Sequence, residues 1–236
     1  MKFLIAVLCL LISLPTLGQG FITGLEQDDF TFLFGNACTV TLESGETVEG
    51  TLTGGSIVSG YLNNITIKGK DGEKLKYKPE DVSKLTIKTS KIAKLAMIAE
   101  STSSIKEATS TDFNEIVNRN QFIFETAMRH NKNEKLRLMQ LLNPGFDSKI
   151  KVYADPNAKE TMGVGIGGIK LTGGVDKSYL LVQNDEKAVR VKKGNYKKDF
   201  DELYKNCPKM LQIFAGEKVK WEDVAGHVFV YDQACK

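Results

Sequence analysis

Hydrophobic and polar residues alternate along residues 38–88, in short runs that are separated by turn signals. Ser44-Gly45 joins the first two runs and Gly69-Lys70-Asp71-Gly72 joins the next two, and both patterns are typical of β-hairpins. Four or five short strands in a segment of this length cannot bury both faces of a flat sheet, so we expect residues 20–90 to close into a small β-barrel. The apolar positions of these strands are Val40, Leu42, Val48, Leu52, Ile65, Ile67, Leu75, Tyr77, Val82, Leu85 and Ile87.

The first hairpin also carries a family pattern, Val40-x-Leu42-x-Ser44-Gly45-x-x-Val48-x-Gly50-x-Leu52. This pattern resembles the first half of an Sm-like or SH3-type small barrel, over about residues 36–90. The resemblance implies that Gly45 makes the turn and that Gly50 permits a strong bend in the second strand. The second Sm signature, a turn that helps to bind RNA, has no counterpart near Asp71-Gly72. The resemblance therefore implies a shape and not an activity, and we expect no nucleic acid as partner.

Residues 91–120 interrupt the strand pattern. Ile92, Leu95, Ala96 and Ala99 have helical spacing, but the Ser/Thr clusters at 101–104 and 110–111 break it. We expect a partly helical connector here and a domain boundary.

Strand signals return over residues 121–193, with the turn Asn143-Pro144-Gly145 and the continuous apolar run Tyr179-Leu180-Leu181-Val182. Helical patterns follow over 195–235: Asn195 and Pro208 suit helix starts, and Gly216 suits a stop. The last helix has a hydrophobic face of Trp221, Val224, Ala225, Val228 and Tyr231. Residues 121–236 are thus expected to form an α+β domain, an antiparallel sheet with C-terminal helices on one face, in a β-rich α+β protein.

The N-terminus has the three parts of a secretory signal peptide. Lys2 precedes an apolar run from Phe3 to Leu14, and Pro15 and small residues up to Gly18 follow. The run is shorter than the roughly 20 residues that span a bilayer, so we expect residues 1–19 to be a signal peptide that is cleaved within two residues of Gly18. The mature chain is then exported and not transmembrane, and it is periplasmic, envelope-associated or secreted. The segments around Asn143–Phe146, Lys151–Tyr153 and Lys177–Tyr179 also resemble exported bacterial proteins, which implies a Gram-negative envelope setting.

Three cysteines follow the signal peptide: Cys38, Cys207 and Cys235. An odd number in an oxidising compartment predicts one pair and one leftover thiol. Cys38 shares a strand face with Val40 and Leu42 and is expected to be a buried thiol. We expect a disulfide between Cys207 and Cys235, which bracket the helical region; the alternative is that both are free thiols.

Candidate catalytic residues are few. Asp223 and His227 are four residues apart on the last expected helix, and a Cys207–His227 dyad competes with the disulfide. His130 lies in a polar turn. The stretch Gly163–Gly174 contains G-x-G-x-x-G, but neither a helix nor a lysine follows in the place that phosphate binding requires, so we expect a glycine-rich strand pair there. We expect no cofactor and no metal site.

The net charge of +3 becomes +2 when Lys2 is removed, which gives no sign of a polyanion-binding chain as a whole. The densest charge feature is basic, and alternation places Arg190 and Lys192 on a solvent face. This feature is either a solvated sheet face or a surface for anionic glycans, lipid headgroups or a protein. Its residues are Lys187, Arg190, Lys192, Lys193, Lys197 and Lys198.

The leading hypothesis from the sequence is an exported, non-enzymatic binding or structural module of the bacterial cell envelope that interacts with a protein or a surface polymer. One alternative is an exported hydrolase with a carboxylate or Cys–His site. Another is a protein that self-assembles into rings, as Sm-like barrels do.

Overall fold

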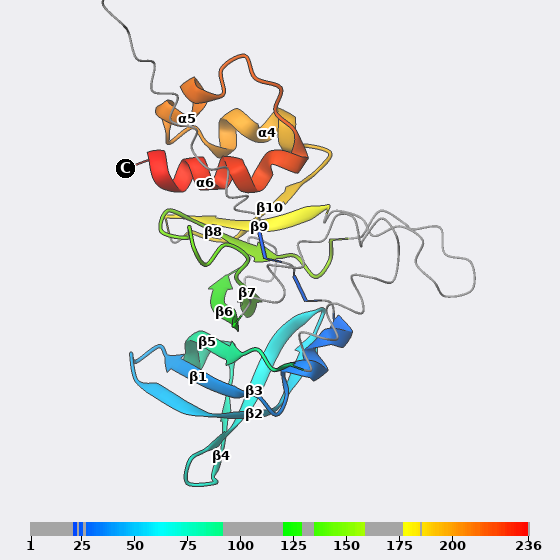
Figure 1. Ribbon diagram of the computed structural model, residues 1–236, viewed down its shortest axis with the longest axis vertical. Coiled ribbons are helices and arrows are strands. Elements are labelled where there is room, and N and C mark those ends of the chain that lie inside the picture. The colour runs from blue at the N-terminus through cyan, green and yellow to red at the C-terminus, as the bar shows by residue number, and fades with distance from the viewer. Residues whose placement is uncertain are drawn as a thin grey trace, which may run out of the picture.

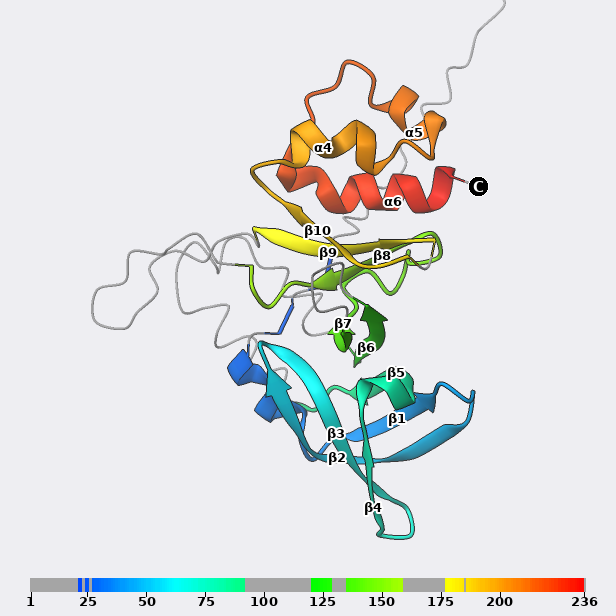
Figure 2. The same ribbon diagram turned by 180° about the vertical axis from the view of Figure 1, so that it is seen from behind.

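The computed structural model describes residues 21–22, 24–25, 27–91, 120–128, 135–158, 177–184 and 186–235. The predicted signal peptide, the connector, His130 and the Gly163–Gly174 stretch lie outside these residues. The described part has three layers, which are a β-barrel at one end, a three-stranded sheet in the middle and helices at the other end (Figures 1 and 2). This arrangement confirms the predicted β-rich α+β fold.

The barrel is closed by six antiparallel strands in the order β2-β1-β5-β6-β7-β3, with β2 and β3 also paired, and β4 extends the sheet beyond β3. Its strands are β1 (Ala37–Leu42), β2 (Thr47–Val58), β3 (Tyr61–Gly69), β4 (Lys74–Tyr77), β5 (Val82–Lys88), β6 (Gln121–Met128) and β7 (Leu136–Gln140). The short 3-10 helices η1 (Gln27–Leu33) and η2 (Pro79–Asp81) flank them.

The hairpin β6–β7 completes the barrel, although we expected residues 121–140 to belong to the following sheet. β6 pairs with β5 from Lys84↔Glu125 to Lys88↔Gln121, and β7 meets β3 at Leu62↔Leu138. Phe122 and Phe124 point into the barrel core with Val40, Leu85 and Ile87. The alternation of residues 121–124 shows a half-buried strand, but it does not show which strand is its neighbour.

The bend of β2 allows one strand to serve two partners. β2 pairs with β1 through Thr47–Thr51 and with β3 through Gly50–Val58. A Cβ atom on Gly50 would overlap the carbonyl oxygen of Lys68 and lie 2.6 Å from Ile67 Cγ2, so β3 can approach only a glycine there. Gly45, at the β1–β2 turn, has a φ of +87°. Gly45 therefore lies in the β1–β2 turn, as expected, and Gly50 lies where β2 pairs with both β1 and β3.

The second sheet has the order β10-β9-β8 and is antiparallel. Its strands are β8 (Ile150–Ala154), β9 (Ser178–Gln183) and β10 (Val189–Lys192), and it is covered on one face by α4 (Tyr196–Leu203), α5 (Pro208–Ile213), η3 (Trp221–Asp223) and α6 (Val224–Ala234).

Both faces of this sheet are buried, which explains the continuous apolar run 179–182. Tyr179 and Leu181 pack with the helices, whereas Leu180 and Val182 pack with Tyr61, Ile123 and Met139 of the barrel.

Residues 21–22 and 24–25 include contacts with both the second sheet and the barrel. The ring of Phe21 packs edge-on to Tyr179 at a centroid distance of 5.0 Å, and Ile22 N–H donates to Leu142 O at 2.8 Å. Leu25 packs on the barrel core, and its N–H donates to the side chain of Gln140 at 2.7 Å.

No helix of the described residues has the length and apolarity to cross a bilayer.

Candidate functional site

The Cys207–Cys235 disulfide is formed, as predicted. The two Cα atoms are 5.5 Å apart, and the bridge joins the residue before α5 to the end of α6. Because Cys207 is oxidised, it has no thiol to act as a nucleophile, and the Cys207–His227 dyad is absent. The remaining described cysteine, Cys38, is buried in the barrel, and burial raises the pKa of its thiol to about 11. It behaves as a small hydrophobic side chain.

His227 lies inside the helical layer rather than on the surface of its helix. It is 4% exposed, and its Nδ1 lies 2.8 Å from the hydroxyl of Tyr196. The rings of Phe200 and Phe214 pack edge-on to it at centroid distances of 5.0 and 4.6 Å. Burial lowers the pKa of His227, and the carboxylate of Asp223, which is exposed, opposes that shift weakly. His227 is therefore a core residue that orients Tyr196, and burial favours its neutral form.

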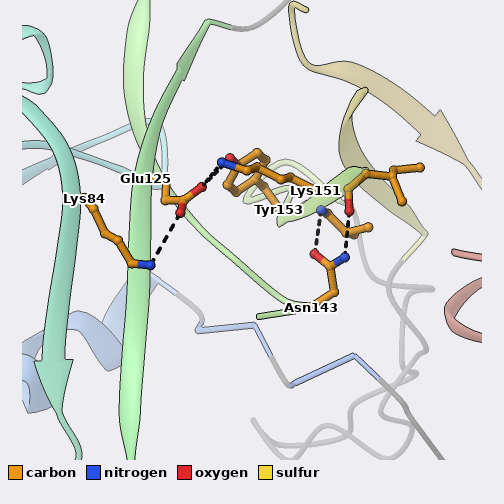
Figure 3. Close-up of polar contacts among 7 residues, drawn as sticks. Lys84, Glu125, Asn143, Lys151 and Tyr153 are labelled. Carbon is orange, nitrogen blue, oxygen red and sulfur yellow. Dashed lines mark hydrogen bonds and ion pairs between the residues drawn. The ribbon is translucent and has the colours of Figure 1, made fainter. Parts of the chain in front are cut away.

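The polar cluster around Glu125 was not singled out by the sequence. Glu125 comes from β6 at the middle of the barrel wall, yet its side chain points toward the second sheet, where Lys151 and Tyr153 of β8 meet it (Figure 3). Lys151 Nζ donates to Oε2 at 2.8 Å, and the buried Tyr153 hydroxyl donates to the same oxygen at 3.0 Å. Lys84 of β5 lies 3.9 Å from Oε1. One carboxylate thus links three strands of two sheets.

A second carboxylate, Asp147, borders this cluster. Burial raises the pKa of Asp147 and the charge of Glu125 raises it further, whereas Lys151 and Lys84 act in the opposite direction. Perturbed acids of this kind occur at functional sites, and also in structural ion-pair networks. Here the acidic and basic side chains balance, and both donors of Glu125 Oε2 come from the opposing sheet. This geometry fits an anchor between the barrel and the sheet.

Asn143 shapes the loop that leads into β8, and Figure 3 shows it beside the cluster. Its buried amide donates to the carbonyls of Phe146 and Ile150 and accepts from the N–H of Val152, each at 2.8 Å. These bonds satisfy backbone groups of the loop and of β8, so the predicted Asn143-Pro144-Gly145 turn is held by a side chain.

The buried carboxylate of Asp155 changes the interpretation of Arg190. Asp155 accepts from the Ser178 hydroxyl at 2.7 Å and from Arg190 Nη2 at 2.7 Å. The expectation of a free, solvent-facing Arg190 is therefore wrong, because its half-buried guanidinium pairs with the buried carboxylate of Asp155. Lys192, on the same face of β10, is exposed as expected. Arg190 anchors the start of the 155–158 turn.

The other basic residues of this region differ in their partners. Lys193 pairs with Glu222 at 2.9 Å, and Lys187 is half-buried. Lys192, Lys197 and Lys198 are exposed and form no ion pair with a described acid. We call these three residues the α4 lysine face, since they lie at the end of β10 and in the first turn of α4.

Among the described residues, no group of three or more His, Cys, Asp or Glu side chains gathers where it could hold a metal ion. One cavity between the barrel and the second sheet measures about 10 Å³, room for a single water molecule, and its wall includes Phe30, Tyr61 and Met139 but not Glu125.

The described residues define an α+β protein with a closed barrel. No family model, curated protein or solved structure matches the chain.

Proposed function

We propose that this chain is an exported, non-enzymatic binding module of a bacterial cell envelope, and that the α4 lysine face contacts an anionic polymer there. The observation that carries the proposal is the set Lys192, Lys197 and Lys198, exposed and without an acidic partner among the described residues. Two of the three candidate catalytic residues have structural roles instead. Cys207 is in the disulfide and His227 is in the core.

The positions of two of these lysines are unfavourable for the fold itself. Lys197 and Lys198 lie in the first turn of α4, whose only acidic residue is Asp199. The N-terminal end of a helix carries partial positive charge, so cations there destabilise the helix by a few tenths of a kcal/mol each. Residues that oppose local stability are expected where a protein binds something. An anionic polymer would remove this repulsion.

Two further points support the setting and the type of barrel. A disulfide persists in oxidising compartments, which fits the predicted export of the chain. The turn at Gly45 and the close approach of β3 at Gly50 fit the proposed SH3 or Sm type of the first strands.

The test is binding of the mature chain to a carboxylated glycan, with polygalacturonate as the probe and neutral dextran as its control. We expect K192Q/K197Q/K198Q to bind about 3- to 100-fold more weakly, since each exposed charge pair is worth up to about 1 kcal/mol. The matched control is K209Q/K218Q/K220Q, which removes the same charge from other exposed positions of the helical layer. Binding should also weaken as salt rises.

Two results would count against the proposal. One is a wild-type chain that does not bind polygalacturonate even at low salt. The other is an equal loss in the control variant, which would make the effect one of net charge rather than of the α4 lysine face.

A further inference from the structure

Strand β4 forms a free edge of the barrel sheet. Among the described strands it pairs only with β3, from Ile65↔Tyr77 to Lys68↔Lys74. Figures 1 and 2 both show β4 at the end of the molecule that is farthest from the helices. The β4 edge is therefore separate from the α4 lysine face.

The register shows which backbone groups of β4 point outward. Gly69 N–H donates to Glu73 O at 2.9 Å, so Gly69 and Glu73 face each other as a hydrogen-bonded pair that closes the hairpin. The alternation of an antiparallel ladder then assigns Leu75 and Tyr77 to hydrogen-bonded pairs with β3 as well. Lys74 and Lys76 are then the non-bonded positions, and their N–H and C=O groups are directed away from β3. The backbone N–H and C=O groups of Lys74 and Lys76 are thus directed to the side where an additional strand could form hydrogen bonds with them.

The side chains along this edge alternate in chemistry. Lys74 and Lys76 are exposed, whereas Leu75 and Tyr77 are half-buried, with Tyr77 packed against the barrel core. Lys68 of β3 is exposed directly opposite Lys74, and neither of them pairs with a described acid. Like charges in such a cross-strand pair destabilise a sheet. An acidic strand beside β4 would relieve this repulsion.

The same charges decide between possible occupants. Two β4 edges from two copies of the chain would place lysines against lysines, which disfavours self-pairing and agrees with the use of lysine to protect free edges. A strand with Asp or Glu at alternate positions would instead meet Lys74 and Lys76 on one face and place its other side chains beside Leu75 and Tyr77. We infer that the β4 edge binds a partner protein by strand addition, through an extended segment in which acidic and apolar residues alternate.

The experiment uses the mature chain and a labelled, blocked peptide, Glu-Val-Glu-Val-Glu-Val-Glu, with fluorescence anisotropy for affinity. Two control peptides separate the sources of binding: one has Gln in place of every Glu, and one has the same composition with all the acids contiguous. We expect the alternating acidic peptide to bind more tightly than both. K74Q/K76Q should weaken it by about 2- to 30-fold, whereas K192Q/K197Q should not.

Two further measurements test the main-chain part of the inference. K76P removes the outward N–H of β4 without removing a bond to β3, so it should bind the peptide about 3- to 10-fold more weakly than K76Q. In hydrogen exchange, the amides of Lys74 and Lys76 should exchange rapidly in the free protein and become protected when the peptide binds. The inference is overturned if these amides stay unprotected, or if the contiguous acidic peptide binds equally well.

Discussion

Removal of the Cys207–Cys235 disulfide gives a loss of stability that can be worked out from the structure. The bridge joins residues 28 apart. Closing a loop of that length restricts the unfolded chain by about 3 to 4 kcal/mol in the chain-entropy description. For a chain of this size, such a loss lowers the melting temperature by about 6 to 16 °C.

The assay is thermal and urea unfolding of the mature chain, with and without a thiol reductant. The sole tryptophan, Trp221, is a reporter of the helical layer because it stacks on Tyr179 at 5.3 Å and shares a core cluster with Cys207. We expect reduction to shift the fluorescence midpoint by the stated amount. Neither cysteine of the disulfide lies in the barrel. After reduction, the β-sheet circular dichroism should therefore disappear at a higher temperature or urea concentration than the Trp221 fluorescence signal.

The control is C207A/C235A, which should be less stable than the oxidised wild type and insensitive to the reductant. If reduction lowers the free energy of unfolding of the wild type by less than about 1 kcal/mol, the reasoning is refuted, because the entropy of loop closure alone predicts a larger loss. An equal shift in the double variant would show that the reductant acts elsewhere.

Three other substitutions test the core and the junction. G50A should destabilise the barrel by about 1 to 3 kcal/mol in urea unfolding because its Cβ meets β3, and an unchanged midpoint would contradict the proposed close approach. E125Q should cost about 1 to 2 kcal/mol because the donors from Lys151 and Tyr153 lose their carboxylate, whereas a neutral result would show that the junction does not depend on it. The pKa of His227 is lower in the folded chain than its ordinary 6.5, so the unfolded chain binds more protons and stability falls as the pH drops below about 6.5. Urea unfolding from pH 7.5 to 5 should show this fall in the wild type and a smaller fall in H227Q; equal slopes would contradict it.

The sequence predicts the elements of this fold better than their neighbours. Alternation correctly marks Phe122 and Phe124 as residues of a half-buried strand, because a period of two is a local property. The pairing of β6 with β5 depends on contacts across the 32 positions between Lys88 and Gln121, and no local pattern encodes it. The same holds for the entry of β7 into the barrel.

The polar anchors show a similar limit. The alternation of Arg190 and Val191 correctly places these two side chains on opposite faces, but it cannot show that Asp155, 35 residues away, pairs with Arg190. Glu125 follows the apolar run Phe122-Ile123-Phe124, and a charge directly after such a run is the one signal that could have marked it. The disulfide was predictable because compartment and cysteine number leave few pairings.

The central claim, that the chain works outside the cytoplasm, is tested most directly by the intact mass of the natural protein after cell fractionation and alkylation. We predict an envelope or secreted fraction whose chain starts within two residues of Gln19, with Cys38 alkylated after unfolding and Cys207 and Cys235 alkylated only after reduction. A cytoplasmic chain that keeps Met1 and has all four cysteines alkylated without reduction would contradict the claim.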